Sequence, residues 1–159
     1  MKAIIIFYSL EGNTESVAQK LKEKLNADLL QLVPEHEYPS SGAAKYLVGG
    51  KAAVFGEKPA LKPFHVDLAD YDTVLVGTPV WASTFAPPLR TFFVDHDIRG
   101  KKVGFFACQA GNGAEKCFDK MKQLTGVGEI QAELILNDPK TKPTDENETK
   151  IAEFCAKIQ

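Results

Sequence analysis

The sequence predicts an α/β domain, a doubly wound parallel sheet with helices on both faces, and two observations support this. Strand-like and helix-like segments alternate along the whole chain of 159 residues, which is the order of βαβ units. The expected strands at 3–7, 73–77 and 102–108 are apolar throughout, as is typical of strands buried on both faces. No linker or repeat divides the alternation, so we expect a single domain over residues 1–159.

In the first half of the chain, the strand at 3–7 leads into a helix over 14–26 whose apolar residues recur at helical spacing. A second strand over 27–33 follows. Residues 34–63 are the least regular part, because Pro, Gly and Ser gather at both ends. A short helix over 42–55 can be drawn there, although two adjacent glycines in its middle weaken it. Its apolar side would consist of Tyr46, Leu47, Val54 and Phe55.

The second half alternates more regularly. A strand at 73–77 is followed by a loop and by a helix that starts at Pro87-Pro88, since proline suits the first turn, and ends by Gly100. The remaining expected elements are a strand at 102–108, a glycine-rich loop at 109–113, a helix at 114–124, a strand at 129–136, a loop at 137–143 and a final helix capped by Thr144.

Composition excludes several classes of function. The formal net charge is −2 and the pI is about 5.9, which favours neither nucleic acid nor an anionic membrane as a partner. No apolar run is long enough to cross a membrane, and no signal peptide is visible, so the cytoplasm is the expected compartment. The odd count of cysteines, Cys108, Cys117 and Cys155, without a C-x-x-C motif indicates packed thiols. The three histidines are scattered, and no metal site is expected.

The first segment with functional potential lies between the strand at 3–7 and the following helix. A turn that enters a helix N-terminus directs free backbone N–H groups outward at the positive end of the helix dipole, which suits phosphate. Ser9, Asn13, Thr14 and Ser16 can add donors, and Gly12 lets the backbone come close. The same residue types are also ordinary turn and N-cap residues, so capping and phosphate binding both remain open.

Two further loops follow strands that should end at the same edge of the sheet, where ligands bind in open α/β folds. One contains Trp81, the only tryptophan. The other contains Gly111, Asn112 and Gly113, which are small enough to let backbone approach a flat ring. A phosphate cradle, an aromatic platform and a glycine-rich wall together indicate a site for a planar heterocycle on a phosphorylated stem.

The segment 9–14, Ser-Leu-Glu-Gly-Asn-Thr, resembles the phosphate loop of flavodoxins, whose usual form is Ser/Thr-x-Thr-Gly-x-Thr. Segments 77–81 and 86–92 resemble the second flavin loop of small flavodoxin-like proteins, and 108–113 resembles the third. The resemblance covers essentially the whole chain. It implies a five-stranded sheet in the order 2-1-3-4-5 and one non-covalent FMN.

The same resemblance assigns cofactor contacts, but no catalytic residue and no metal ligand. Ser9, Gly12, Asn13 and Thr14 would hold the phosphate, Trp81 would stack on the ring, and the third loop would line its other side. The full set of implied cofactor contacts is Ser9, Leu10, Glu11, Gly12, Asn13, Thr14, Thr78, Pro79, Val80, Trp81, Ala82, Cys108, Gln109, Gly111 and Asn112.

Two departures from the family pattern are visible. Glu11 stands where the family commonly has Thr, so its carboxylate must point away from a phosphate or weaken its binding. Electron-carrying flavodoxins tend to be strongly acidic, whereas this chain is nearly neutral, which weakens electrostatic docking onto basic redox partners.

Three functions are compatible with these observations. The first is an FMN electron carrier between redox partner proteins. The second is an FMN-dependent NAD(P)H:quinone-type oxidoreductase acting on a small-molecule acceptor, with residues 34–63 capping its pocket. The third, a phospho-acceptor signalling domain, is disfavoured because the ends of the first and third strands carry no clustered acids.

Overall fold

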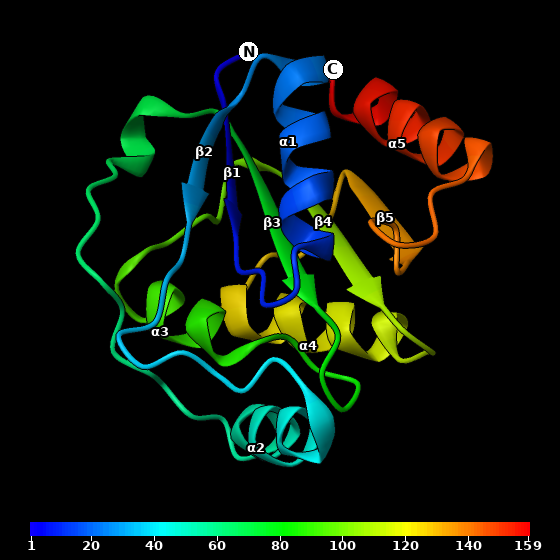
Figure 1. Ribbon diagram of the computed structural model, residues 1–159. Coiled ribbons are helices and arrows are strands. Elements are labelled where there is room, and N and C mark those ends of the chain that lie inside the picture. The colour runs from blue at the N-terminus through cyan, green and yellow to red at the C-terminus, as the bar shows by residue number, and fades with distance from the viewer.

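The computed structural model describes residues 1–159 and contains one five-stranded parallel sheet in the order β2-β1-β3-β4-β5. This is the fold class and strand order that the sequence and its resemblance predict. Figure 1 shows the strands running side by side with the same polarity. The strands are β1 (Ala3–Phe7), β2 (Asp28–Gln31), β3 (Thr73–Pro79), β4 (Lys102–Gln109) and β5 (Ala132–Asn137).

Helices cover both faces of the sheet (Figure 1). On one face lie α1 (Asn13–Leu25) and α5 (Asp145–Ile158), and on the other lie α3 (Pro87–Asp95) and α4 (Ala114–Thr125). The fifth helix, α2 (Gly42–Val54), lies apart from both layers, beyond the ends of the strands. A 3₁₀ turn at Leu68–Asp70 precedes β3.

The alternation of side chains along β1 divides the core into two layers. Ile5 and Phe7 pack with apolar residues of α1 and α5, whereas Ile4 and Ile6 pack with those of α3 and α4. All five residues of β1 are buried. Helices on both faces therefore explain why the strand is apolar along its whole length, and β1 lies inside the sheet between β2 and β3.

Several element boundaries differ from the sequence prediction. The helix α3 ends at Asp95, before Gly100, because His96 caps it with an extended backbone while its Nδ1 lies 2.8 Å from the carbonyl oxygen of Phe92. Strand β5 begins at Ala132 rather than at 129. Strand β2 is limited to Asp28–Gln31, with fewer residues than the predicted 27–33.

The predicted orientation of α2 is wrong. The four residues proposed as its apolar side, Tyr46, Leu47, Val54 and Phe55, are all exposed, with 63–72% of their surface accessible. The helix instead buries Gly49, Ala52 and Ala53. The buried side of α2 consists of small residues because the helix backbone packs closely against Trp81, so that a Cβ on Gly49 would lie 3.3 Å from Cε3 of the indole.

The three cysteines are buried free thiols, as predicted. No helix is both long and apolar enough to cross a membrane. Both chain ends lie at the amino-terminal edge of the sheet, and the strand arrows in Figure 1 point away from them toward α2. The carboxyl ends of β1, β3 and β4 therefore open on the side of the molecule opposite to the termini.

Candidate functional site

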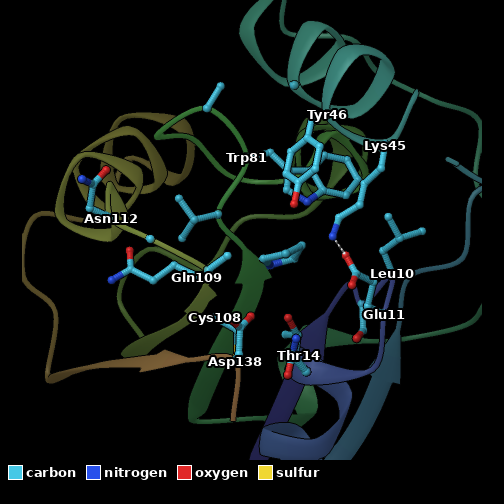
Figure 2. A pocket seen from close by; sticks show the side chains of 18 residues that line it. Leu10, Glu11, Thr14, Lys45, Tyr46, Trp81, Cys108, Gln109, Asn112 and Asp138 are labelled. Atoms are coloured by element: carbon cyan, nitrogen blue, oxygen red, sulfur yellow. Dashed lines mark ion pairs between the residues drawn. The ribbon is translucent and has the colours of Figure 1, made fainter. Parts of the chain in front are cut away.

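A cavity of about 450 Å³ lies at the carboxyl ends of β1, β3 and β4 (Figure 2). Its volume is within the range of small-molecule and cofactor sites. The structure brings together most of the residues that the sequence singled out. Those that line the cavity are Ser9, Leu10, Glu11, Asn13, Thr14, Pro79, Val80, Trp81, Ala82, Cys108, Gln109, Gly111 and Asn112.

The loop between β1 and α1 forms one wall of the cavity. Gly12 is the N-cap of α1 with a φ of 96°, a left-handed backbone that glycine adopts without strain, and no side chain caps the helix from that position. Ser9 Oγ accepts a hydrogen bond from the backbone N–H of Glu15 at 3.1 Å. Ser9 thus satisfies one N–H of the first turn of α1.

Thr14, in the first turn of α1, also lines the cavity, and only 1% of its surface is exposed. Its hydroxyl has no nitrogen or oxygen partner, and the Cys108 thiol is the polar group it contacts. Burial raises the pKa of Cys108 to about 12, and the hydrogen bond with the Thr14 side chain lowers it in part. The thiol is therefore protonated, and since a thiol is only a weak hydrogen-bond partner, the buried Thr14 hydroxyl remains poorly satisfied.

Trp81 forms the aromatic wall on the loop after β3. Its backbone exchanges two hydrogen bonds with Thr84, at 2.9 and 3.0 Å, which close a tight turn over Ala82 and Ser83. Both turn residues have positive φ, 50° and 60°, although neither is glycine. A non-glycine backbone held in this region is strained, and such strain is commonly found at ligand sites.

Two tyrosines hold the Trp81 indole edge-on. Its ring centre lies 5.6 Å from that of Tyr8 and 5.2 Å from that of Tyr38, with interplanar angles of 85° and 78°. The Tyr8 hydroxyl donates to the Glu37 carboxylate at 2.8 Å. Burial and this carboxylate raise the pKa of Tyr8, and burial with Glu57 and Glu37 raises the pKa of Tyr38 to about 12. Both phenols are therefore neutral supports of the indole.

The loop after β4 closes the opposite wall. Gln109 Oε1 accepts a hydrogen bond from the backbone N–H of Ala114 at 3.0 Å and so caps α4. Gly113 has a φ of 104°, and a side chain there would collide with Ser83. The glycine thus lets the second and third loops pack against each other. Asn137 on β5 donates to the Gly111 carbonyl at 3.2 Å and fixes the outer part of the loop.

Two of the predicted contact residues do not line the cavity. Gly12 is covered by the side chain of Lys140. Thr78 is fully buried, and its hydroxyl accepts from the Ala86 N–H at 2.9 Å and donates to the Pro79 carbonyl at 2.8 Å. Thr78 therefore holds the loop after β3 in shape. Pro79, expected in the loop itself, is the last residue of β3.

Two further segments line the cavity: one lies within residues 34–63, which the sequence placed over the pocket only in the oxidoreductase alternative, and the other was not expected there. Helix α2 places Lys45, Tyr46 and Gly50 along the cavity, and the loop after β5 contributes Asp138. In Figure 2, Lys45 extends from α2 toward Glu11, with which it forms an ion pair. The loop after β5 could have been found, because β5 is parallel to the other strands and ends at the same edge. The position of α2 agrees with the alternative in which residues 34–63 cap the pocket, but no sequence signal singles out Lys45.

The arrangement is suited to binding rather than to acid–base or nucleophilic chemistry. A helix N-terminus with a buried hydroxyl that has no nitrogen or oxygen partner suits an anionic group, and the Trp81 wall suits a flat apolar one. The cysteine thiol in the cavity is held protonated, which removes it as a nucleophile.

Comparison with known proteins gives one family match. The family model described as flavodoxin matches residues 2–148, which is nearly the whole chain.

Solved structures with the same fold cover the chain almost completely. A Bacteroides eggerthii protein assigned as a flavoprotein is 24% identical, with a TM-score of 0.75 over 99% of this chain and 97% of its own. A flavoprotein from Lactobacillus acidophilus NCFM, solved in complex with FMN, is 20% identical, with a TM-score of 0.68 over 87% and 94%. Oxidised flavodoxin 2 from Bacillus cereus is 19% identical, with a TM-score of 0.64 over 99% and 97%.

Proposed function

Because this chain belongs to the flavodoxin family, we propose that it binds FMN non-covalently in the cavity and carries electrons through it. One observation supports this most directly. The Thr14 hydroxyl is buried with no nitrogen or oxygen partner at the N-terminus of α1, on the same cavity as the Trp81 indole. A phosphate at the helix end and a flat ring beside Trp81 satisfy both features at once.

In this proposal the loop after β1 holds the phosphate through Ser9, Asn13, Thr14 and the backbone at Gly12. Trp81 stacks on one side of the flavin ring, and the loop after β4 lines the other. FMN supplies the one- and two-electron chemistry, while the protein binds the ring, orients it and limits its contact with water. The partly apolar wall around the ring disfavours added negative charge and so lowers the flavin potential.

The absorption spectrum of the purified protein tests the proposal. We expect a yellow protein, or a colourless one that becomes yellow when FMN is added and unbound flavin is removed by gel filtration. The control is the Trp81→Ala variant taken through the same steps, which should retain less flavin. A wild-type protein that stays colourless after incubation with FMN contradicts the proposal.

A second candidate function is FMN-dependent reduction of a small acceptor, such as a quinone, with NAD(P)H as donor. It is favoured by α2, which extends the cavity wall beyond the sheet edge through Lys45, Tyr46 and Gly50. Steady-state oxidation of NADH or NADPH with a quinone present separates the two functions. Turnover supports the enzyme, whereas an FMN-loaded protein without turnover that exchanges electrons with a redox partner protein supports the carrier. Either function is compatible with the cytoplasm.

A further inference from the structure

Charged side chains gather around the N-terminus of α1 although the chain as a whole is nearly neutral. Two carboxylates, Glu11 and Asp138, line the cavity. Three lysines lie beside them: Lys45 on α2, and Lys140 and Lys142 on the loop between β5 and α5. The way these five groups are paired determines the charge that a bound anion meets.

Glu11 is neutralised by Lys45. The ammonium of Lys45 forms an ion pair with the Glu11 carboxylate across the cavity mouth, with 22% of the lysine side chain and 42% of the glutamate side chain exposed. The hydrogen bond to Glu11 also raises the pKa of Lys45 and keeps the lysine charged. Since no other cation forms an ion pair with Glu11, α2 supplies the counter-charge for a carboxylate in the phosphate loop.

Lys140 is the cation that remains without an acidic partner. Its backbone N–H donates to Asn13 Oδ1 at 3.0 Å, which fixes the residue against the start of α1. Its Nζ lies 3.5 Å from the Glu11 carbonyl oxygen and covers Gly12. The nearby Asp138 carboxylate lies 3.7 Å from Lys142 instead. With Glu11 and Asp138 both paired, Lys140 is the one of these three lysines whose charge no ion pair takes up, and it stands beside the loop without lining the cavity itself.

We propose that this arrangement selects for the phosphate of the ligand: Lys45 cancels the repulsion from Glu11, and Lys140 attracts the phosphate monoester dianion. The inference rests on the proposed function, since it assumes a flavin in the cavity, and it adds which residues distinguish FMN from riboflavin, the same ring without phosphate. Lys45 acts through Glu11, so it is a positioning residue. Lys140 acts on the phosphate without Glu11.

The two lysines therefore differ in a measurable way. Losing Lys45 exposes a unit negative charge near a dianion, and losing Lys140 removes a unit positive charge, so each change should weaken FMN binding by about tenfold. The loss caused by Lys45→Met disappears when Glu11 is also neutral. The loss caused by Lys140→Met persists in a Glu11→Gln background.

The experiment measures dissociation constants of FMN and riboflavin by fluorescence titration of the full-length chain freed of flavin. The variants are Lys45→Met, Lys140→Met, Glu11→Gln and the two double variants that combine Glu11→Gln with each lysine change. Lys51→Met is the matched control, because Lys51 is an exposed lysine on α2 that does not line the cavity. Circular dichroism and thermal unfolding of each variant show that it is folded.

We expect Lys45→Met and Lys140→Met to weaken FMN about tenfold while leaving riboflavin unchanged, and Lys51→Met to change neither. Glu11→Gln should restore FMN affinity in the Lys45 variant to within about threefold of the Glu11→Gln single variant. Equal losses for FMN and riboflavin overturn the inference, since the lysines would then act on the ring or the fold. Absence of rescue by Glu11→Gln also overturns it, because Lys45 would then contact the ligand directly.

Failure of the proposed function is distinguishable from failure of this inference. If the wild-type protein binds neither flavin, the FMN proposal itself is wrong. If it binds FMN and riboflavin equally well, the flavin proposal survives and the inference about phosphate selection does not.

Discussion

Trp81 contacts Tyr8 and Tyr38 edge-on, which leaves the indole supported from behind and available to the cavity. Trp81→Ala should weaken FMN binding by about tenfold, because a stacked aromatic contact and its buried area are lost. It should also increase the fluorescence of the flavin that remains bound. Titration of the protein with FMN, followed by flavin emission, measures both effects.

Trp81→Phe is the matched variant for this experiment, since it keeps an aromatic ring with less area. We expect its affinity to lie between those of the wild type and Trp81→Ala. Unchanged affinity and emission in Trp81→Ala would place the flavin ring away from the indole.

Replacing Thr14 by valine should stabilise the free protein and weaken its binding of FMN. Thr14→Val removes a buried hydroxyl that has no nitrogen or oxygen partner in the free protein, so the free energy of unfolding should rise by about 1 kcal/mol. The same change should weaken FMN binding by about 1.5–3 kcal/mol, because a hydrogen bond to a charged phosphate is lost. Urea unfolding of the free protein and FMN titration measure the two quantities.

Thr14→Ser serves as the control because it keeps the hydroxyl and loses only a methyl group. It should retain most of the FMN affinity. If Thr14→Val weakened neither the FMN complex nor its selectivity for phosphate, the hydroxyl would have no role at the ligand.

At the scale of the element, α2 is a helix with adjacent glycines that meet different surroundings. A Cβ on Gly49 would lie 3.3 Å from Cε3 of Trp81, whereas one on Gly50 would meet nothing within 4 Å. Both replacements by alanine gain helix propensity, worth about 0.5–1 kcal/mol. We therefore expect Gly50→Ala to raise the free energy of unfolding by about that amount, and Gly49→Ala to raise it less.

Chemical denaturation followed by tryptophan emission measures this difference, because Trp81 is the only tryptophan and reports on its own contact with α2. Gly49→Ala should also shift the emission of the folded protein, and Gly50→Ala should not. Equal gains in stability with unshifted emission would show that α2 does not press against the indole in solution.

The elements also show what the sequence could and could not predict. The strands β1, β3 and β4 were predicted within two residues because burial on both faces makes them continuously apolar. The cavity-lining residues that follow these strands could be predicted because the loops after parallel strands all lie at the carboxyl edge of the sheet. Lys45 could not be found, since α2 is apolar on its exposed side and buries mainly small residues, whereas Tyr46 belongs to the segment 34–63 that the oxidoreductase alternative placed over the pocket.

The same reasoning explains why Thr78 does not line the cavity. Its position next to Pro79 in a ligand-edge loop favours a cofactor contact, but only the three-dimensional path of the loop shows its hydroxyl turned toward the Ala86 N–H. Lys140 was missed for a different reason. It is distant in sequence from α1, and a backbone hydrogen bond to Asn13 brings it there.

At the scale of the whole molecule, buried thiols make stability sensitive to alkaline pH. Burial raises the pKa values of Cys108 and Cys117 to about 12, whereas the pKa of a cysteine in the unfolded chain is about 8.5. Above that lower value the unfolded chain releases protons that the folded protein keeps. The free energy of unfolding should therefore be highest below about pH 8.5 and fall continuously as pH rises toward about 12.

Urea unfolding at several pH values, with a reductant present, measures this decline. Cys117→Ala is a useful variant because Cys117 lies outside the cavity. It should lower stability at every pH through the lost packing and also make the decline above about pH 8.5 shallower. An unchanged slope in that variant would contradict the role of the thiol.

Both chain ends lie at the amino-terminal edge of the sheet, opposite to the cavity. A tether attached at either end would therefore hold the molecule with its ligand rim directed outward. If the protein were immobilised in this way on an electrode, the flavin would face dissolved donors and acceptors and not the electrode surface. Voltammetry with a soluble mediator would then be the suitable measurement.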